Sequence, residues 1–284
     1  MGIRRCENEN VKMKHGSIFS GVGGFDLAAS YLNWENVFQI EIDSFCQEVL
    51  RRRFPSSVRY CDIRRVNAKK YYGAIDVISG GWPCQPFSAA GKRRGSSDNR
   101  YLWPQMLRII NEVRPTWVVG ENVVGITSMV QSSLSTSLAD QASLWEEDKT
   151  YTVEEEFIIE TICKDFERMG YSVQPIIIPA CAVGAWHRRD RIWFLAYSDR
   201  FRYERRLFGT CRTEEILPAP FLTRIKTFNL QRIEKDILAK PGLIENYDGF
   251  STRLVKNEIK GYGNSIVPAI AYEIFRAIDI IHHA

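Results

Sequence analysis

Paired cysteines, long apolar runs and internal repeats are all missing from this sequence. Its seven cysteines form no Cys-x-x-Cys pair, which excludes a zinc-finger spacing and gives no disulfide framework. We therefore expect no metal, and free thiols as in a reducing compartment. The first 15 residues lack the apolar core of a signal peptide, and no segment reaches the roughly 18 apolar residues of a membrane helix. These absences predict a soluble, cytoplasmic protein with no membrane partner.

A strong excess of charge is also missing. Lysine and arginine number 38 against 34 acidic residues, and this net charge of +4 is compatible with a polyanionic partner without requiring one. Hydrophobic residues make up 45% of the 284, as in ordinary globular proteins, which excludes disordered and fibrous classes. The length suits two domains or one large α/β domain with an insertion.

Short apolar runs alternate with amphipathic segments along most of the chain. This pattern predicts strands at residues 15–19, 37–42, 76–79, 117–120, 173–180 and 192–197. It predicts helices after the first strand, after a capping box of Ser44 and Gln47, at 102–113, at 157–169 and near the C-terminus. The alternation favours a mostly parallel sheet covered on both faces. The Ser-rich run 128–143 is interpreted as a surface loop, and a smaller region is expected between about 198 and 248.

A glycine-rich turn follows the first predicted strand and opens a helix. It is Phe19-Ser-Gly-Val-Gly-Gly24, and glycines at such a place let a nucleotide approach the backbone and the free N–H groups of the helix. Glu41, about twenty positions on, is placed to bind ribose hydroxyls. Asp62 is placed to accept from an adenine amino group. An ordinary tight turn and a helix-capping Asp are the alternatives.

Three further clusters carry groups able to do chemistry. Cys84 stands between two prolines in Gly81-Trp-Pro-Cys-Gln-Pro-Phe-Ser88, a rigid setting that favours a nucleophile over a buried structural thiol. The basic run 91–95 that follows would lower the thiol pKa or meet phosphates, unless it is simply a solvated loop. Glu121 follows the carboxyl end of a predicted strand, where polar residues line the ligand crevice of an open α/β sheet. A role in capping a helix is the alternative. Arg189 and Arg191, two apart, would point the same way, towards a ligand or towards a surface ion pair.

Together these segments resemble the DNA cytosine-5 methyltransferases, particularly their compact bacterial and phage-type members. The turn at 19–24, the Pro-Cys loop, Glu121-Asn-Val, Arg189-Asp-Arg191 and Gly263-Asn-Ser-Ile-Val-Pro268 occur in the family's order, between about residues 14 and 277. Two positions depart from the family pattern, with Trp186 in place of Pro and His187 in place of Gln. The resemblance implies a Rossmann-like S-adenosylmethionine-dependent methyltransferase fold with a mixed, mostly parallel sheet and a small target-recognition region.

The resemblance also implies a reaction. Cys84 would add to cytosine C6, Glu121 would hydrogen-bond the N3 side of the ring and Arg191 would contact the O2 carbonyl. Arg189 would support the pocket of Cys84 and Glu121. C5 would take the methyl group of S-adenosylmethionine after the base has been flipped out of duplex DNA. The cofactor site implied by the family comprises Phe19, Gly21, Gly23, Gly24, Glu41, Ile42, Asp62, Ile63, Pro83, Asn264 and Ser265.

For the DNA side, the resemblance implies a catalytic domain of residues 14–197 plus 249–284 and a recognition region of 198–248. The residues expected to contact double-stranded DNA are Gln85, Ser88, Lys92, Arg93, Arg94 and Arg253. A monomer that protects DNA in restriction-modification or in a phage is expected, with any cognate endonuclease acting separately. A tRNA cytosine-5 methyltransferase and a catalytically silent DNA-binding regulator remain as alternatives.

Overall fold

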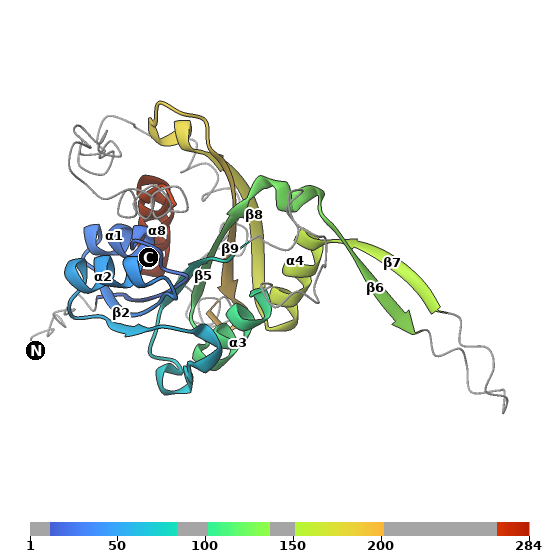
Figure 1. The fold of residues 1–284 in the computed structure, drawn as a ribbon, viewed down its shortest axis with the longest axis horizontal. Helices are drawn as coiled ribbons and strands as arrows, with labels where there is room; N and C mark the ends of the chain where they lie inside the picture. Colours follow the sequence, from blue (N-terminus) through green and yellow to red (C-terminus); the bar gives the residue numbers. More distant parts are fainter. Residues whose placement is uncertain (1–11, 84–101, 137–150, 202–265, 284) are drawn as a thin grey trace, which may run out of the picture.

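The computed structural model describes residues 12–83, 102–136, 151–201 and 266–283 (Figure 1). Its centre is a seven-stranded sheet in the order β3-β2-β1-β4-β5-β9-β8. The strands are β1 (Lys14–Ile18), β2 (Glu35–Ile40), β3 (Val58–Tyr60), β4 (Val77–Gly81), β5 (Trp117–Val123), β8 (Tyr171–Pro179) and β9 (Asp190–Ser198). Five neighbouring strands, β3, β2, β1, β4 and β5, run parallel to one another, and β9 is antiparallel to both β5 and β8. The predicted mixed, mostly parallel α/β sheet is confirmed.

The strand order reverses direction between β1 and β4. From β1 the chain moves outward to β2 and β3, and it then returns to place β4 on the other side of β1. In open α/β sheets the crevice outside the carboxyl ends of the strands at such a switch point is where ligands bind. The glycine turn follows β1, and the Pro-Cys segment follows β4. The fold therefore brings the glycine turn and the first residues of the Pro-Cys segment, 81–83, to the same edge of the sheet.

Helices cover both faces of the sheet, as its strands predict. α1 (Gly24–Tyr31) and α8 (Pro268–His283) cover one face, where Phe25 stacks on Phe275. α3 (Trp103–Val113) and α4 (Ile158–Arg168) cover the other, where Trp103 meets Phe166 edge to face. Strands buried on both faces need nearly continuous apolar sequence, which is the signal that made them predictable.

The C-terminal helix returns to the start of the chain. α8 packs against α1, and Trp34 Nε1 donates a hydrogen bond to Asp279 Oδ1 at 2.7 Å. The Trp34 ring also stacks on Phe275, with ring centres 4.9 Å apart. The amphipathic pattern predicted for this helix is confirmed, since Ile270, Ile274, Phe275 and Ile278 are buried. Both ends of the described chain thus contribute to one side of the sheet.

Two sequence-based expectations are wrong. Part of the Ser-rich run forms β6 (Val130–Thr136), which pairs antiparallel with β7 (Tyr151–Phe157) in a ribbon that projects away from the main sheet (Figure 1). The serines hid this strand because the run lacks an alternation of apolar and polar residues. The cap of α2 (Ser44–Arg53) is Asp43, whose side chain accepts from the N–H groups of Phe45 and Cys46. Ser44 is instead the first helical residue.

Candidate functional site

The turn after β1 has a backbone that glycine adopts most readily. Gly21 and Gly23 have φ values of +55° and +86°, and Phe19 shares this left-handed region at +56°. A Cβ at Gly23 would lie 2.5 Å from the Phe54 ring, whereas one at Gly21 would meet nothing within 4 Å. Packing therefore requires glycine at 23, where α1 begins with Gly24, and leaves open space beside Gly21.

Glu41 is tied directly to this turn. Its Oε2 accepts a hydrogen bond from the Gly21 N–H at 2.7 Å, and its Oε1 accepts one from the Asp43 N–H at 2.7 Å. A carboxylate has about four acceptor positions, so the hydroxyl groups of a ligand can still bind. The expected acidic residue and glycine turn are brought together. Sequence reasoning missed that Glu41 also holds the turn in place.

The ends of β2 and β3 carry the next three predicted residues. The Glu41 N–H donates to the Tyr60 carbonyl at 3.0 Å, which holds the two strand ends together. Ile42 is 68% exposed, an unusual state for an isoleucine beside a polar turn. Asp62 Oδ1 accepts from the Arg64 N–H at 3.0 Å and so caps the 3₁₀ helix η1 (Ile63–Arg65), as its alternative interpretation predicted. The Ile63 side chain is buried in the core.

The ends of β4 and β5 form the second half of the site. Gly81 lies beside Glu121 in the parallel ladder, and a Cβ at Gly81 would stand 3.1 Å from Glu121 Oε2. A Cβ at Gly120 would lie 2.8 Å from the Trp82 ring. These glycines leave room for the carboxyl group and for the tryptophan that precedes Pro83. Glu121 lies within β5, which is longer than predicted.

Arg191 forms an ion pair with Glu121, with its Nε 3.0 Å from Oε1. The side chains are 22% and 12% exposed, so the pair is largely withdrawn from water. Burial raises the pKa of the Glu121 carboxyl above its ordinary value, while the guanidinium groups of Arg191 and Arg189 act in the opposite direction. Burial also lowers the pKa of the Arg189 guanidinium, with a smaller contribution from the like charge of Arg191. The three predicted side chains therefore share one electrostatic environment.

Asn122 is a site residue that sequence reasoning did not single out. It is 2% exposed, and its Nδ2 donates to the Trp82 carbonyl at 3.1 Å. This bond fixes the main chain just before Pro83, where the segment with Cys84 begins. Its place next to Glu121, at the end of a predicted buried strand, was a signal that could have revealed it. A polar side chain at such a place is expected to be buried and therefore to need hydrogen-bond partners.

Several predicted site residues lie outside the described residues: Cys84, Gln85, Ser88, Lys92, Arg93, Arg94, Arg253, Asn264 and Ser265. Pro83 is described and is exposed. Among the residues that the structure describes, no three His, Cys, Asp or Glu side chains are grouped to hold a metal ion. The helices in this part of the chain include none that is long and apolar enough to cross a bilayer.

Comparison with known families decides how this geometry is classified. The family model of the C-5 cytosine-specific DNA methylases matches residues 13–257, and this range includes both halves of the site. The chain belongs to this family. The matched range contains the turn at 19–24, the Pro-Cys loop, Glu121-Asn-Val and Arg189-Asp-Arg191, so the family that the resemblance implied is confirmed.

The chain is similar to several bacterial members. It is 29% identical to the Type II methyltransferase M.NgoMIV of Neisseria gonorrhoeae over 185 residues, which cover 65% of this chain and 51% of that protein. It is 26% identical to M.HhaI of Haemophilus parahaemolyticus over 230 residues, 81% of this chain and 58% of that protein. A solved structure described as a prophage-encoded DNA modification methyltransferase of E. coli is 25% identical, with a TM-score of 0.49, and the match covers 67% of this chain and 48% of that one. The chain spans about half the length of the curated relatives it matches.

Proposed function

We propose that the protein transfers a methyl group from S-adenosylmethionine to C5 of cytosine in a specific double-stranded DNA sequence. The observation that carries this proposal is the largely buried pair of Glu121 and Arg191, set beside the end of β4. Cys84 follows that strand end by three residues in the sequence. A nucleophile, a buried carboxyl group and a guanidinium group are the parts that addition to a cytosine ring needs, and family membership supports the same reaction.

The chemistry of these side chains fits the reaction. The Cys84 thiolate would add to C6, and electrons would flow to the N3 side of the ring, where a proton is needed. Glu121 has a pKa raised by burial, which favours a carboxyl that holds a proton there. Arg191 already occupies Oε1 through its Nε and would donate its remaining N–H groups to the O2 carbonyl, with Arg189 supporting the pair. C5 would then take the methyl group of S-adenosylmethionine, which would leave S-adenosylhomocysteine as the product. Loss of the C5 proton to solvent and breaking of the bond between Cys84 and C6 would release the thiolate and 5-methylcytosine.

The residues present fit the methyl donor. The open space beside Gly21, the remaining acceptor positions of Glu41 and the exposed Ile42 offer room, hydroxyl acceptors and an apolar face for an adenosyl group. Phe19, Gly23, Gly24, Asp62, Ile63 and Pro83, with Asn264 and Ser265, complete the proposed site. When bound, S-adenosylmethionine supplies an activated methyl group from its sulfonium centre.

The DNA side of the proposal follows from the sequence. Residues 14–197 and 249–284 would form the catalytic domain, and residues 198–248 the recognition region. Gln85, Ser88, Lys92, Arg93, Arg94 and Arg253 would contact DNA. Phosphate contacts position a protein on the duplex, whereas base contacts specify the sequence. We place the protein in the cytoplasm as a monomer that protects DNA, with any cognate endonuclease acting separately.

The test is sequencing of 5-methylcytosine in DNA from cells that express the wild-type protein, the Cys84→Ala variant or the Cys181→Ala control. The host should lack cytosine-5 methylation of its own. Cys181 is an exposed cysteine of η5 (Ala180–Val183) outside the proposed machinery. We expect methylation at one recurring sequence with wild type and Cys181→Ala, and none with Cys84→Ala.

Other outcomes would redirect the assignment. Methylation that survives in Cys84→Ala would overturn the nucleophile. An absence of signal in DNA, followed by tritiated methyl transfer to tRNA, would identify the RNA methyltransferase instead. An absence of transfer to either nucleic acid, together with binding to DNA, would identify a silent regulator.

A further inference from the structure

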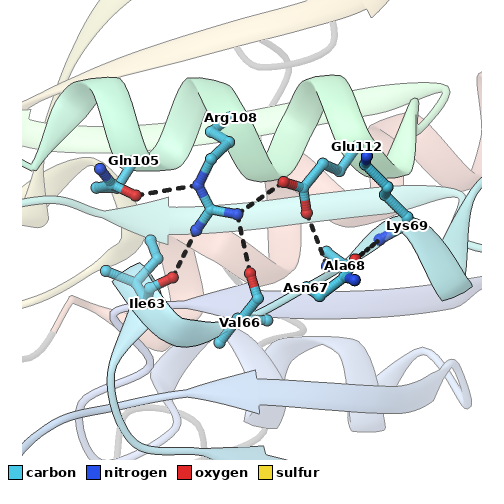
Figure 2. A network of polar contacts seen from close by, with 8 residues as sticks. All are labelled: Ile63, Val66, Asn67, Ala68, Lys69, Gln105, Arg108 and Glu112. Carbon is cyan, nitrogen blue, oxygen red and sulfur yellow. Dashed lines mark hydrogen bonds and ion pairs between the residues drawn. The ribbon is translucent and has the colours of Figure 1, made fainter.

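Two side chains of α3, Arg108 and Glu112, hydrogen-bond the main chain of residues 63–68, the segment that follows β3 (Figure 2). Arg108 Nη2 donates to the Ile63 carbonyl at 2.6 Å, and Arg108 Nη1 donates to the Val66 carbonyl at 2.8 Å. Glu112, one helical turn later, accepts from the Ala68 N–H through Oε2 at 2.7 Å. Glu112 Oε1 also pairs with Arg108 Nη1 at 2.7 Å, so the two side chains act as one unit.

These hydrogen bonds should be strong, because charged side chains bind main-chain groups where they are largely shielded from water. The side chains of Arg108 and Glu112 are 32% and 13% exposed. Hydrogen bonds with an ionised partner are shorter and about twice as strong as neutral ones. The guanidinium fork holds two carbonyl groups at once, which the single ammonium of lysine cannot reproduce. Three main-chain groups between residues 63 and 68 are thereby fixed to one helix.

The segment 63–68 starts next to the proposed adenosyl site. Asp62, immediately before it, is one of the residues proposed to bind the adenine amino group. On its other side the chain is tied to Glu41, because the Glu41 N–H binds the Tyr60 carbonyl. Gln47 Nε2 bridges the Glu41 carbonyl at 2.6 Å and Cys61 Sγ at 2.8 Å. Asp62 thus lies between an anchor on β2 and an anchor on α3.

We propose that Arg108 and Glu112 are positioning residues for the methyl donor, which act by holding Asp62 at the distance from Glu41 that an adenosyl group requires. This inference rests on the proposed function. α3 is also the helix that follows the segment with Cys84 in the sequence. One helix therefore both follows the nucleophile's segment and supports the cofactor side.

The test measures S-adenosylmethionine binding by calorimetry without DNA, so that the readout is independent of turnover. Arg108→Gln is compared with Arg114→Gln, a matched control on the end of the same helix. Arg114 donates to the Met169 carbonyl at 2.8 Å and to Asn111 Oδ1 at 2.6 Å, and neither bond involves the segment 63–68. We expect Arg108→Gln to raise Kd about tenfold, equivalent to about 1.4 kcal/mol. Arg114→Gln should leave Kd within about twofold.

A double variant separates positioning from general loss of structure. If Arg108 acts through Asp62, Arg108→Gln should add little to the Kd of Asp62→Ala, because coupled residues are not additive. KM for S-adenosylmethionine should rise in Arg108→Gln while kcat at saturation stays near wild type. Arg108→Lys should recover part of the affinity. Should Arg108→Gln fold poorly, Glu112→Gln decides, with a smaller expected rise in Kd.

Equal Kd values for Arg108→Gln and wild type would overturn the positioning role, as would fully additive effects with Asp62→Ala, and in both cases the proposed function would stand. A wild-type protein that binds no S-adenosylmethionine would overturn the proposed function, and the positioning role with it. The two failures are therefore distinguishable from one set of titrations.

Discussion

Asp26 and Glu121 are both buried carboxyl groups, and burial raises the pKa of each, yet they have different surroundings. Asp26 is fully buried, and it accepts hydrogen bonds from Ser17 Oγ at 3.0 Å and from Gln39 Nε2 at 2.9 Å. Ser17 in turn contacts Ser20 Oγ at 2.6 Å, inside the turn after β1. Glu121 instead faces two guanidinium groups at the edge of the sheet.

His15 lies close enough to Asp26 for each group to affect the pKa of the other. His15 Nδ1 lies 2.7 Å from Asn36 Oδ1, and His15 Nε2 lies 2.7 Å from Ser79 Oγ. Asn36 Nδ2 donates elsewhere, so Asn36 Oδ1 is the acceptor for a proton on Nδ1, while the Ser79 hydroxyl can donate to Nε2 or accept from it. Burial lowers the pKa of His15, which favours the neutral form of the ring. The comparison teaches that direction of a pKa shift does not reveal a role, whereas the charge and accessibility of the partners do.

The largest effect expected from this comparison is on turnover. Glu121→Gln keeps the shape of the side chain but removes its ability to hold and release a proton, so methyl transfer should fall by about 10²- to 10⁴-fold. The Tm should fall as well, because the amide oxygen can still accept from Arg191 but the counter-charge to the two guanidinium groups is lost. Initial rates at saturating cofactor and a thermal melt check this. A rate within about tenfold of wild type would remove Glu121 from the chemistry.

Asp26 should show the reverse behaviour. Asp26→Ala leaves Ser17 and Gln39 without their acceptor and creates a cavity, so the free energy of unfolding should fall by about 2–4 kcal/mol. Asp26→Asn, which keeps the shape and hydrogen-bonding capacity, should cost about 1 kcal/mol or less. Urea unfolding measures both. If Asp26→Ala is as stable as wild type, the buried network does not support the turn.

Glu41 lies between these two cases, since it both holds the turn and is proposed to bind the ribose. Glu41→Ala should weaken S-adenosylmethionine binding by about tenfold or more, through loss of charge-assisted hydrogen bonds. Its affinity for DNA should remain within about twofold of wild type. Separate titrations with the two ligands check this. A larger loss for DNA than for the cofactor would contradict the ribose role.

The smallest expected effect is a difference between wild type and Asp26→Asn in how the free energy of unfolding depends on pH. Burial raises the pKa of Asp26 above its ordinary value of 3.8, so its contribution to stability is full below that pH and is lost as the pH rises through the folded-state pKa. The Asn variant lacks this loss, so its stability relative to wild type should increase as the pH rises above about 4. Urea unfolding across this range measures the difference. A constant difference between the two proteins would mean that burial does not shift Asp26.

Much of the fold was predictable because its determinants are local. The central strands β4, β5 and β9 are largely buried and apolar, and the helices carry clear amphipathic patterns, so their order alone indicated the α/β sheet. The edge strand β3 was not predicted, because it has only three residues and Val58 is exposed. The β6–β7 ribbon was missed since its serines and glutamates do not alternate with apolar residues. The cap of α2 was placed one residue late because Ser44 and Asp43 are both capable caps.

The site was predictable where residue types mark chemistry and hidden where main-chain contacts decide. Glu121, Arg189 and Arg191 were identified from their order, and the structure brings them together. The bonds of Glu41 to Gly21 and of Arg108 to Ile63 could not be predicted, since any residue type supplies an N–H or a carbonyl group. Sequence spacing gives which side chains share a helix face, but not which distant backbone they reach.

The central claim is transfer of a methyl group to C5 of cytosine. The most direct test incubates the purified protein with DNA and S-adenosylmethionine carrying a deuterated methyl group, then digests the DNA to nucleosides for mass spectrometry. The account predicts deuterated 5-methyldeoxycytidine with wild type and none with Cys84→Ala. Label on the exocyclic amine of cytosine or adenine would contradict it, because that transfer needs no thiolate addition to C6.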